Sequence, residues 1–491
     1  MTPTLTLKPQ FSLADRIGSP WAAYAAATAS GLLLSVSFGM HPPWWAAWLA
    51  PAPLLVGALT GPPQRAFRLG AVAGLISALG VLGQWAMFLG WPLTLVMVLA
   101  RGFFWGGVIR LAADSARRGP AWAAALCAPA MAAGIETLVQ TVSPHGSYGS
   151  LAYSQSALVL VQQVAALGGP SAITFVLMTG GVSLGLVAAR LAGAPIAGTR
   201  LAVAAGTGFM IAAAALGWGA WRLGHAQAAP SVPAALVATD RFPGEPDDWD
   251  PIWRAYAPAI AATASPGGVV VAPEKLALVS PAKAAQVAGE VGQLAKAHLA
   301  TIVLGVEVGD PRAGYANRAL IAGPDGLTRW YDKQRLNPGM EDRDRPGRLV
   351  TTWLMGSARL GVAVCKDMHF PQLGRAYGRA GSGLMLVPAW DFGFDGWLND
   401  RLSALRGVES GFSVARAARQ GVLSLTDRYG RVVAEAATQG AAMVTVRGRL
   451  PAAAGTTVYD RVGDLFGWVC VAVAFLALAW QGRARRADAA A

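Results

Sequence analysis

Long apolar segments dominate the first half of the chain, and one more lies near its end. Each is about 17 to 24 residues long, which is the length that a helix needs to cross roughly 30 Å of hydrocarbon. The first segment lacks the small-residue cleavage pattern of a signal peptide and is followed at once by others, so we expect it to be retained. The pattern predicts eight membrane-spanning helices, at 21–39, 44–60, 67–90, 91–112, 120–138, 170–189, 201–221 and 465–480.

Between residues 231 and 449 the pattern changes to short β-rich runs and amphipathic stretches. The runs predict strands at 234–239, 268–272, 301–306, 318–322, 327–331, 360–365, 383–388, 421–426 and 443–447. Helices are predicted at 281–299 and 399–419. The Asp325-Gly326 pair between two of the strands favours a hairpin, because it tolerates the positive φ of a tight turn. Alternating strands and helices indicate an α/β layered domain.

The arginines and lysines between the apolar segments orient the chain. They gather in alternate connections, at Lys8, Arg16, Arg65, Arg68, Arg117, Arg118, Arg190, Arg200, Arg483, Arg485 and Arg486, whereas the connections at 41–43, near Gly90 and at 139–156 carry none. The positive-inside rule therefore predicts cytoplasmic termini and a domain on the outer side. We predict an N-terminal membrane domain of about seven helices over 1–228, an extracytoplasmic domain over 229–455, and a final helix with a basic tail over 456–491.

Composition agrees with a membrane protein, since 54% of the residues are hydrophobic and only 14% are charged, and the mean hydropathy is +0.42. A soluble protein has roughly 25% charged residues. The net charge of +13 is explained by cytoplasmic loops near anionic lipid. Because no basic stripe carries interleaved aromatic residues, nucleic acid is excluded as a partner. The five histidines are scattered without metal-ligand spacing, so we expect no metal and no cofactor.

Cys365 is the candidate nucleophile. It ends the apolar run Arg359-Leu-Gly-Val-Ala-Val-Cys365, and the other cysteines, Cys127 and Cys470, fall in predicted spans. A thiol that ends a strand and has no disulfide partner in its own domain is suited to nucleophilic catalysis. The alternative is a buried small hydrophobe, which is the usual role of a free cysteine.

Two further segments of the domain deliver charged residues at strand ends. One is Val270-Val-Ala-Pro-Glu274, and the other is Trp330-Tyr-Asp-Lys333, followed by a Pro-Gly loop that leads to Glu341. Each charge alone is as readily explained by solvent exposure. Together with Cys365, in the order Glu, Lys, Cys, the segments resemble the carbon-nitrogen hydrolase (nitrilase) superfamily. The resemblance implies an αββα sandwich with a catalytic triad of Glu274, Lys333 and Cys365, and it makes Glu341 a fourth, supporting carboxylate.

The predicted membrane domain makes the chain similar to one particular branch of this superfamily. Short motifs follow one another along the chain in an order similar to that of the apolipoprotein N-acyltransferases, the membrane-embedded branch of the superfamily. They are Phe38-Gly39, Arg65-Ala-Phe-Arg-Leu-Gly70, Gly149-Ser-Leu-Ala-Tyr-Ser-Gln155, Arg406-Gly-Val-Glu409, Asp427-Arg-Tyr-Gly430 and Tyr459-Asp-Arg-Val-Gly463. The resemblance implies a monomer in the bacterial inner membrane with a periplasmic catalytic domain, a phospholipid acyl donor and a diacylated lipoprotein as acceptor.

The sequence departs from that family around the triad. Lys275 follows Glu274 where the family has Thr, and Lys366-Asp367 follows Cys365 where it has Tyr-Glu. Ala389-Trp-Asp-Phe392 stands in place of an Asn-Asp-Ala-Trp segment. We expect Lys366, Asp367 and Trp390 to contact substrate, in a pocket that differs from the usual one.

Residue chemistry supports acyl transfer through a thioester. A free thiol with a pKa near 8.5 needs help at neutral pH, and Glu274 can take its proton and later return it. Lys333 can supply a fixed positive charge for the oxyanion. The alternatives are a membrane-anchored amidase or nitrilase that uses water, which the altered motifs favour, and a non-catalytic lipid-binding protein.

Three ionisable residues have less certain roles. His369 lies close to Cys365 in sequence, but with Glu274 and Lys333 available we expect it to act indirectly or at the surface. Arg101 and Glu136 fall inside predicted spans, where charges are costly and usually face the protein interior or water. They are interpreted either as contacts to a phospholipid headgroup or a polar network in a cavity of the bundle, or as an arginine that reaches the membrane surface or pairs with Glu136.

Overall fold

The computed structural model describes residues 19–226, 228–438 and 440–490, and the chain forms two compact units. Lys8 and Arg16, which enter the predicted orientation, lie outside these residues. One unit holds the described residues up to Ile135, together with Thr174–Ala215 and those from Val469 onward. The other holds Glu136–Ile173 and Leu216–Trp468. The boundaries between the units fall inside four helices, each of which contributes residues to both units. They are α7 (Ala123–Val142), α9 (Ala165–Leu191), α10 (Gly198–Gly224) and α16 (Leu465–Ala490).

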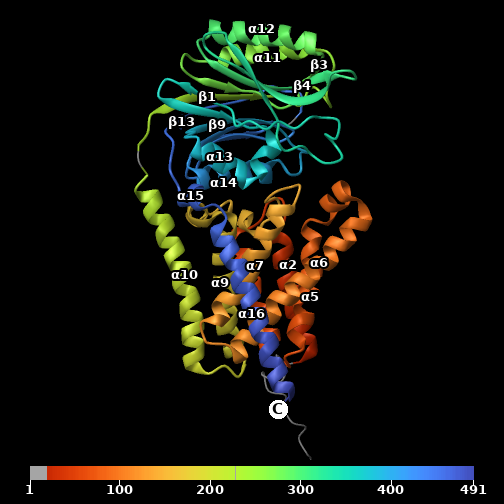
Figure 1. The fold of residues 1–491 in the computed structure, drawn as a ribbon, viewed down its shortest axis with the longest axis vertical. Coiled ribbons are helices and arrows are strands. Elements are labelled where there is room, and N and C mark those ends of the chain that lie inside the picture. The colour runs from red at the N-terminus through yellow and green to blue at the C-terminus, as the bar shows by residue number, and fades with distance from the viewer. Residues whose placement is uncertain (1–18, 227, 439, 491) are drawn as a thin grey trace, which may run out of the picture. The chain divides into compact units, whose positions relative to one another are not determined.

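The first unit is helical. Its other helices are α2 (Pro20–Ser37), α3 (Trp44–Leu49), α4 (Pro51–Leu59), α5 (Arg65–Ser77), the short η1 (Ala78–Gly80) and α6 (Leu82–Arg118). Helices α2, α5 and α6 lie side by side (Figure 1). A Cβ at Gly70 would lie 2.5 Å from the carbonyl oxygen of Trp105, and one at Gly74 would lie 2.6 Å from that of Arg101. The two glycines therefore let α5 and α6 approach closely, as small residues do in membrane bundles.

Five helices of the described chain are long and apolar enough to cross a membrane, namely α6, α7, α9, α10 and the Leu465–Ala484 part of α16. The sequence predicted eight spans. The difference arises in the N-terminal part. The 18-residue helix α2, which forms at the first predicted span, is not among the five, α3 and α4 are separate short helices, and α5 ends at Ser77. The predicted boundary at Gly90 is a kink with φ 71° inside α6, and the chain breaks earlier, at Ala78–Gly80.

The second unit contains two β-sheets. The seven-stranded sheet has the order β13-β1-β2-β4-β5-β6, with β3 beside β4, and the six-stranded sheet has the order β12-β11-β10-β9-β8-β7. The strands of the first are β1 (Ser231–Ala238), β2 (Val269–Val271), β3 (Leu278–Val279), β4 (Thr301–Asp310), β5 (Gly314–Ala322), β6 (Thr328–Asp332) and β13 (Val444–Pro451). Those of the second are β7 (Thr352–Met355), β8 (Ala358–Val362), β9 (Leu384–Trp390), β10 (Ser413–Arg419), β11 (Val422–Thr426) and β12 (Val432–Ala437).

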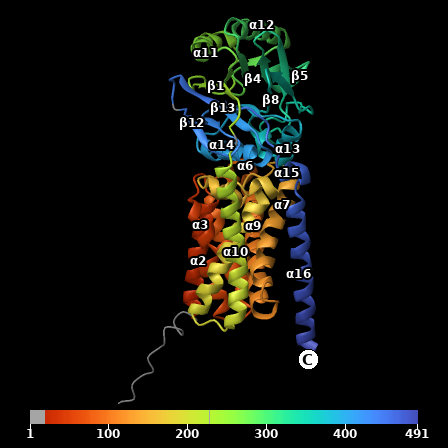
Figure 2. The same cartoon turned by 90° about the vertical axis from the view of Figure 1, so that its left-hand side faces the viewer.

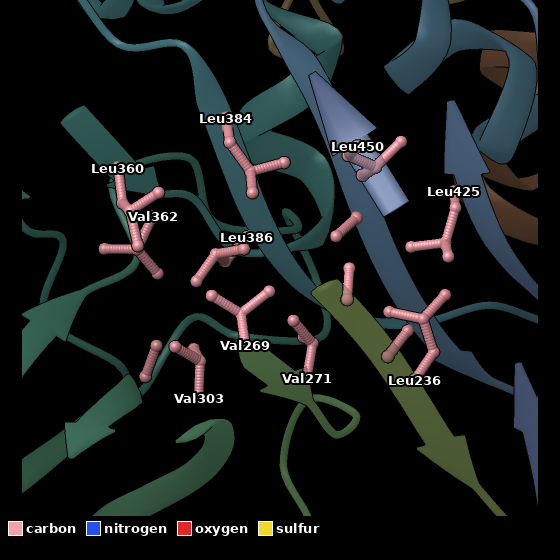
Figure 3. Packing of buried hydrophobic residues seen from close by; sticks show 14 of the residues in the cluster. Leu236, Val269, Val271, Val303, Leu360, Val362, Leu384, Leu386, Leu425 and Leu450 are labelled. Atoms are coloured by element: carbon pink, nitrogen blue, oxygen red, sulfur yellow. The ribbon is translucent and has the colours of Figure 1, made fainter. Parts of the chain in front are cut away.

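Four layers result, and they form the αββα sandwich that the sequence predicted. The sheets lie between the pair α11 (Trp249–Thr263) and α12 (Pro281–Ala297) and the pair α13 (Pro371–Arg379) and α14 (Gly396–Ser410), as both views show (Figure 1, Figure 2). The core between the sheets contains Leu236, Val269, Val271 and Val303 from one sheet and Leu360, Val362, Leu384 and Leu386 from the other (Figure 3). Because β2 and β9 contribute alternate side chains to this core, their ends are held at fixed positions beside it.

One predicted helix is partly wrong. Residues 399–419 were expected to form one helix, but α14 ends at Ser410, Gly411 takes a left-handed φ of 74°, and Ser413–Arg419 form β10. The run Val-Ala-Arg-Ala-Ala-Arg has good helix propensity, which favoured the wrong interpretation. Tertiary pairing decides otherwise, because β10 lies between parallel β9 and antiparallel β11 and is buried along its whole length.

The remaining elements of the second unit are short. They are η2 (Leu151–Gln155), α8 (Val159–Gln162), η3 (Cys365–His369) and α15 (Val458–Val462). The segment before η2 packs on η3, since Ser147 donates from its backbone N–H and its hydroxyl to the carbonyl oxygen of His369, at 3.0 and 2.8 Å. Glu136 of α7 accepts hydrogen bonds from the Ser150 hydroxyl and the Leu151 N–H, both at 2.8 Å, so this carboxylate caps η2.

Candidate active site

Glu274 is positioned by the end of β2. The strand is buried between β1 and β4, and Ala272 and Pro273 carry the chain out of the sheet. The Glu274 N–H donates to the carbonyl oxygen of Ala389 at the end of β9, at 3.2 Å. A Cβ on Gly305 of β4 would lie 2.5 Å from the Glu274 Cα. Glycine at that position therefore allows the backbone of Glu274 to approach the sheet, and the carboxylate is 2% exposed.

Lys333 follows β6 and connects two carboxylates. Its Nζ lies 2.7 Å from Glu274 Oε1 and 2.9 Å from Glu341 Oε2, and its side chain is 1% exposed. Burial opposes the ammonium charge, but the charges of Glu274 and Glu341 raise the pKa of Lys333 well above its usual value. Lys333 is therefore a permanently charged ammonium inside the protein, which is the property that oxyanion stabilisation requires.

Glu341 lies in the loop after β6 and is held by several donors. The Asn337 N–H donates to its Oε2 at 2.7 Å, and Asn317 Nδ2 donates to its Oε1 at 2.7 Å and to Glu274 Oε1 at 2.6 Å. Burial acts against the charge of Glu341, but Lys333 and then Lys275 hold its pKa at about 2. The carboxylate stays ionised at neutral pH and, together with Glu274, fixes the Lys333 ammonium.

Asn317 was not predicted as a site residue. It lies in β5, and its side-chain amide bridges Glu274 and Glu341. In the sequence Asn317 is a single amide shortly before the apolar run Ala319 to Ala322, and such a signal is too weak to identify a site. Only the antiparallel pairing of β5 with β4 and β6 brings it to the carboxylates.

Cys365 begins η3, three residues after β8 ends. It adopts a left-handed φ of 46°, which is uncommon for a side chain other than glycine and is characteristic of functional turns. Its Sγ donates to the carbonyl oxygen of Trp390 at 3.6 Å and is close to the position where β9 also meets Glu274. Burial and the charge of Glu274 raise the pKa of the thiol well above its usual value, although Lys333 acts in the opposite direction. At neutral pH Cys365 is a thiol, so its activation requires a base.

Lys366 and Asp367 bind the loop after Lys333. Lys366 Nζ donates to the carbonyl oxygen of Leu336 at 2.8 Å, and burial and the charge of Lys333 lower its pKa to about 8. Asp367 is 0% exposed and accepts from the N–H groups of Gln334 and Arg335, at 3.1 and 2.8 Å. Both residues therefore fasten η3 to the segment that carries Glu341, and a direct contact with substrate stays a prediction.

Trp390, at the end of β9, and Asp391 after it lie near the Cys365 thiol. The Trp390 indole N–H donates to Gln420 Oε1 at 2.8 Å, and the Arg419 guanidinium lies 3.6 Å from the centre of its ring. Asp391 and Arg416 form a buried pair with distances of 2.9 and 2.6 Å, and their charges act on Cys365. This pair was missed because Arg416 was placed in a helix rather than in β10.

The other candidates lie apart from this cluster or act indirectly. The His369 ring stacks on Tyr148, and burial followed by the charge of Lys366 lowers its pKa well below the usual value, so it is neutral. Arg101 Nε donates to the Ser77 hydroxyl at 2.6 Å, and its guanidinium lies 3.8 Å from the centre of the Phe38 ring. Cys127 and Cys470 are buried in α7 and α16. Among the described residues no group of three His, Cys, Asp or Glu side chains is arranged to hold a metal ion.

Fold and site together define a class: membrane-type helices joined to a nitrilase-like αββα domain with a buried Glu-Lys-Glu cluster and a nearby cysteine. The family model for the apolipoprotein N-acyltransferase N-terminal domain matches residues 30–183. The apolipoprotein N-acyltransferase of Geobacter metallireducens is 28% identical over 509 residues, 91% of this chain and 93% of the relative. That of Thermotoga maritima is 30% identical over 144 residues, 27% of each chain.

Two amidases also match part of the chain. An (R)-stereoselective amidase of a Pseudomonas species is 29% identical over 73 residues, 15% of this chain and 27% of the relative. A solved structure of an amidase variant from Nesterenkonia sp. AN1 in complex with butyramide has a TM-score of 0.41 and 20% identity, and covers 49% of this chain and 98% of that chain. The predicted resemblance to the apolipoprotein N-acyltransferases is confirmed by the family model and by the relative that matches along nearly the whole chain.

Proposed function

We propose that this chain is an N-acyltransferase that moves an acyl chain from a phospholipid, through a thioester on Cys365, to the α-amine of a lipoprotein's N-terminal diacylglyceryl-cysteine. The observation that carries the proposal is the buried cluster of Glu274, Lys333 and Glu341 near that thiol. It occurs in a chain that resembles the apolipoprotein N-acyltransferase of Geobacter metallireducens over 91% of its length. Neither a metal nor a cofactor is required by this chemistry.

The first half-reaction forms the thioester. Glu274 accepts the proton of Cys365, and the thiolate attacks the ester carbonyl carbon of the phospholipid. Lys333 and the backbone N–H after Cys365 stabilise the oxyanion of the tetrahedral intermediate. When the intermediate collapses, the C–O bond breaks and the lysophospholipid leaves with the proton from Glu274. The raised pKa of the thiol makes this base necessary, since little thiolate forms without it.

The second half-reaction transfers the acyl chain. The amine of the acceptor attacks the thioester carbon, again with the oxyanion beside Lys333. Glu274 takes the proton that the amine loses, the C–S bond breaks, and the proton returns to the sulfur of Cys365. One carboxylate thus serves as base and acid in turn, which is possible because Lys333 and Asn317 hold it in place.

Membrane helices suit this reaction because both substrates are lipids and reach the thiol from the bilayer. We propose that both termini are cytoplasmic and that the αββα domain faces the periplasm of a bacterial inner membrane, as the loop charges predict. A reporter that is active only in the cytoplasm is expected to be silent when fused at Gly323, in the turn between β5 and β6. Activity of that fusion would overturn the orientation and with it the lipoprotein acceptor.

A labelling experiment tests the transferase. The purified chain, incubated with phospholipid labelled in its acyl chain, is expected to retain label on Cys365, because a water-poor site suppresses hydrolysis of the thioester. Addition of a diacylated lipopeptide with a free α-amine should move the label to the peptide. Mass spectrometry of the Cys365 peptide and of the lipopeptide measures both steps.

A membrane-anchored carbon-nitrogen hydrolase is the second candidate, favoured by Lys275 and Lys366 at positions where the resemblance implies other residues. It predicts turnover of small amides and no label on Cys365 from phospholipid. Rapid release of labelled fatty acid without peptide labelling would indicate a lipid hydrolase instead. Either result would refute the acyltransferase.

A further inference from the structure

Lys275 is a second buried lysine beside the proposed site. It follows Glu274 directly, adopts a left-handed φ of 48°, and its carbonyl oxygen accepts from Arg419 Nη2 at 2.9 Å. Its side chain is 5% exposed. The ammonium lies near carboxylates from three separate segments: Glu307 Oε2 at 2.7 Å, Glu245 Oε1 at 2.8 Å, Asp344 Oδ2 at 3.4 Å and Glu341 Oε1 at 3.6 Å.

Glu341 connects this cluster to the proposed triad. The oxygen that faces Lys275 also accepts from Lys333 Nζ at 3.0 Å and from Asn317 Nδ2 at 2.7 Å. On the far side of the cluster Arg343 Nη2 lies 2.9 Å from Glu245 and 2.5 Å from Glu307, with its side chain 48% exposed. Positive and negative groups therefore alternate from Glu274 through Lys333, Glu341 and Lys275 to the surface.

We propose that Lys275 is a positioning residue for acyl transfer: its ammonium keeps Glu341 ionised and in place, and Glu341 in turn holds Lys333 where the oxyanion forms. The inference rests on the proposed function. It concerns a residue at which the chain departs from the pattern of the family it resembles, where Thr is expected.

The charges of the cluster supply the physical reason. Burial opposes the charge of Lys275, but hydrogen bonds to Glu245 and Glu307 raise its pKa above the usual value, so the ammonium is permanent. Burial raises the pKa of Glu245 and of Asp344, and the charge of Lys275 acts in the opposite direction on both, so these carboxylates depend on Lys275 to stay ionised. Without Lys275, Glu341 would lose one of the two lysines that lower its pKa, and it would face Asp344 without the cation that both carboxylates share. Repulsion would then displace Glu341, so that it would hold Lys333 less firmly.

Every charged group that faces the two residues enters this balance. Those around Lys275 are Glu245, Glu307, Glu341, Arg343, Asp344 and Arg419. Those around Glu341 are Lys275, Lys333, Asp344 and Lys366, with Glu274 beyond Lys333. Removal of the Lys275 charge therefore raises the pH at which the carboxylates of the cluster protonate.

The test uses the full chain in lipid nanodiscs and the acyl-transfer assay. In Lys275→Met we expect kcat to fall about tenfold, less than the loss expected for an oxyanion group itself, because Lys275 acts through Glu341. KM should stay within about threefold, because Lys275 does not touch substrate. The acid limb of the kcat profile should move to higher pH by about one unit. Lys275→Arg keeps the charge and should restore at least part of kcat.

A variant that removes a negative charge from the cluster distinguishes an effect of charge from an effect of packing. Glu307→Gln is nearly isosteric and removes one negative charge from the same cluster, so it should move the acid limb to lower pH. Lys283→Met serves as the matched control, since Lys283 pairs with Asp250 on the surface of α12. If Lys275→Met does not fold, the comparison of Glu307→Gln and Lys275→Arg with the native chain still measures the effect of charge.

Alkylation of Cys365 by iodoacetamide gives a readout that needs no substrate. The pH dependence of its rate, measured on the Cys365 peptide, should move to higher pH in Lys275→Met, because a displaced Lys333 no longer lowers the pKa of the thiol. Unchanged alkylation and kcat profiles in both charge variants would overturn the proposal. A native chain without acyl transfer would refute the proposed function alone, since the alkylation profiles would still test Lys275.

Discussion

Cys365→Ala is expected to abolish acyl transfer and every substrate-derived adduct on the protein. Loss of a nucleophile that acts with an adjacent base typically lowers kcat by 10⁴-fold or more, and here about that loss is expected. The side chain is small and sits at the start of η3, so the fold should persist. Transfer to a diacylated lipopeptide measures the activity, and intact-protein mass spectrometry measures the adduct.

Cys470→Ala is the matched control, because it removes a buried thiol from α16, outside the αββα domain. It should retain both activity and adduct. An acyl adduct on the Cys365→Ala protein would show that the nucleophile lies elsewhere.

Lys333→Met is expected to lower kcat by about 10² to 10³, because the oxyanion loses its fixed positive charge. It should also reduce the free energy of unfolding by about 3 to 5 kcal/mol at pH 7, since Glu274 and Glu341 remain buried without their partner. The native pKa of Glu341, about 2, lies below its ordinary value of 4.5. That carboxylate therefore stabilises the native fold above pH 4.5, and the contribution is lost as the pH falls towards about 2.

The stability difference between Lys333→Met and the native chain should consequently be largest at neutral pH and shrink under acid conditions. Thermal unfolding at pH 7 and at about pH 3, between the two pKa values, measures it. Lys296→Met, at an exposed position of α12, is the control for loss of a lysine charge. A variant with native kcat would remove Lys333 from the oxyanion site, whatever its stability.

The αββα domain illustrates how far local pattern reaches. Nine of its strands were predicted, because short runs rich in β-branched residues between turn residues are typical of strands. Each predicted strand has a counterpart in the sheets. Residues 413–419 were assigned wrongly because their alanines and arginines favour a helix locally. Their place between β9 and β11 depends on strands that are distant in the sequence.

The residues of the candidate site were likewise only partly predictable from the sequence. Glu274, Lys333, Glu341 and Cys365 were recognised because each stands at the end of a strand or in the loop after one, in an order that resembles a known superfamily. Asn317, Lys275, Asp391 and Arg416 were not, because a single amide, a lysine or an ion pair has no distinctive local signal. Their roles arise only where side chains from several segments meet.

The sequence alone determined the membrane character, the layered α/β domain and the residues that we propose carry the chemistry, because hydropathy, strand patterning and motif order are local properties. The tertiary structure determined which charged side chains are buried in contact with one another. Lys333 meets Glu274 and Glu341, and Lys275 meets four carboxylates, only because the ends of β2, β4 and β6 converge. Electrostatic energies depend on distance and burial rather than on sequence separation, so they become defined only when the sheets assemble.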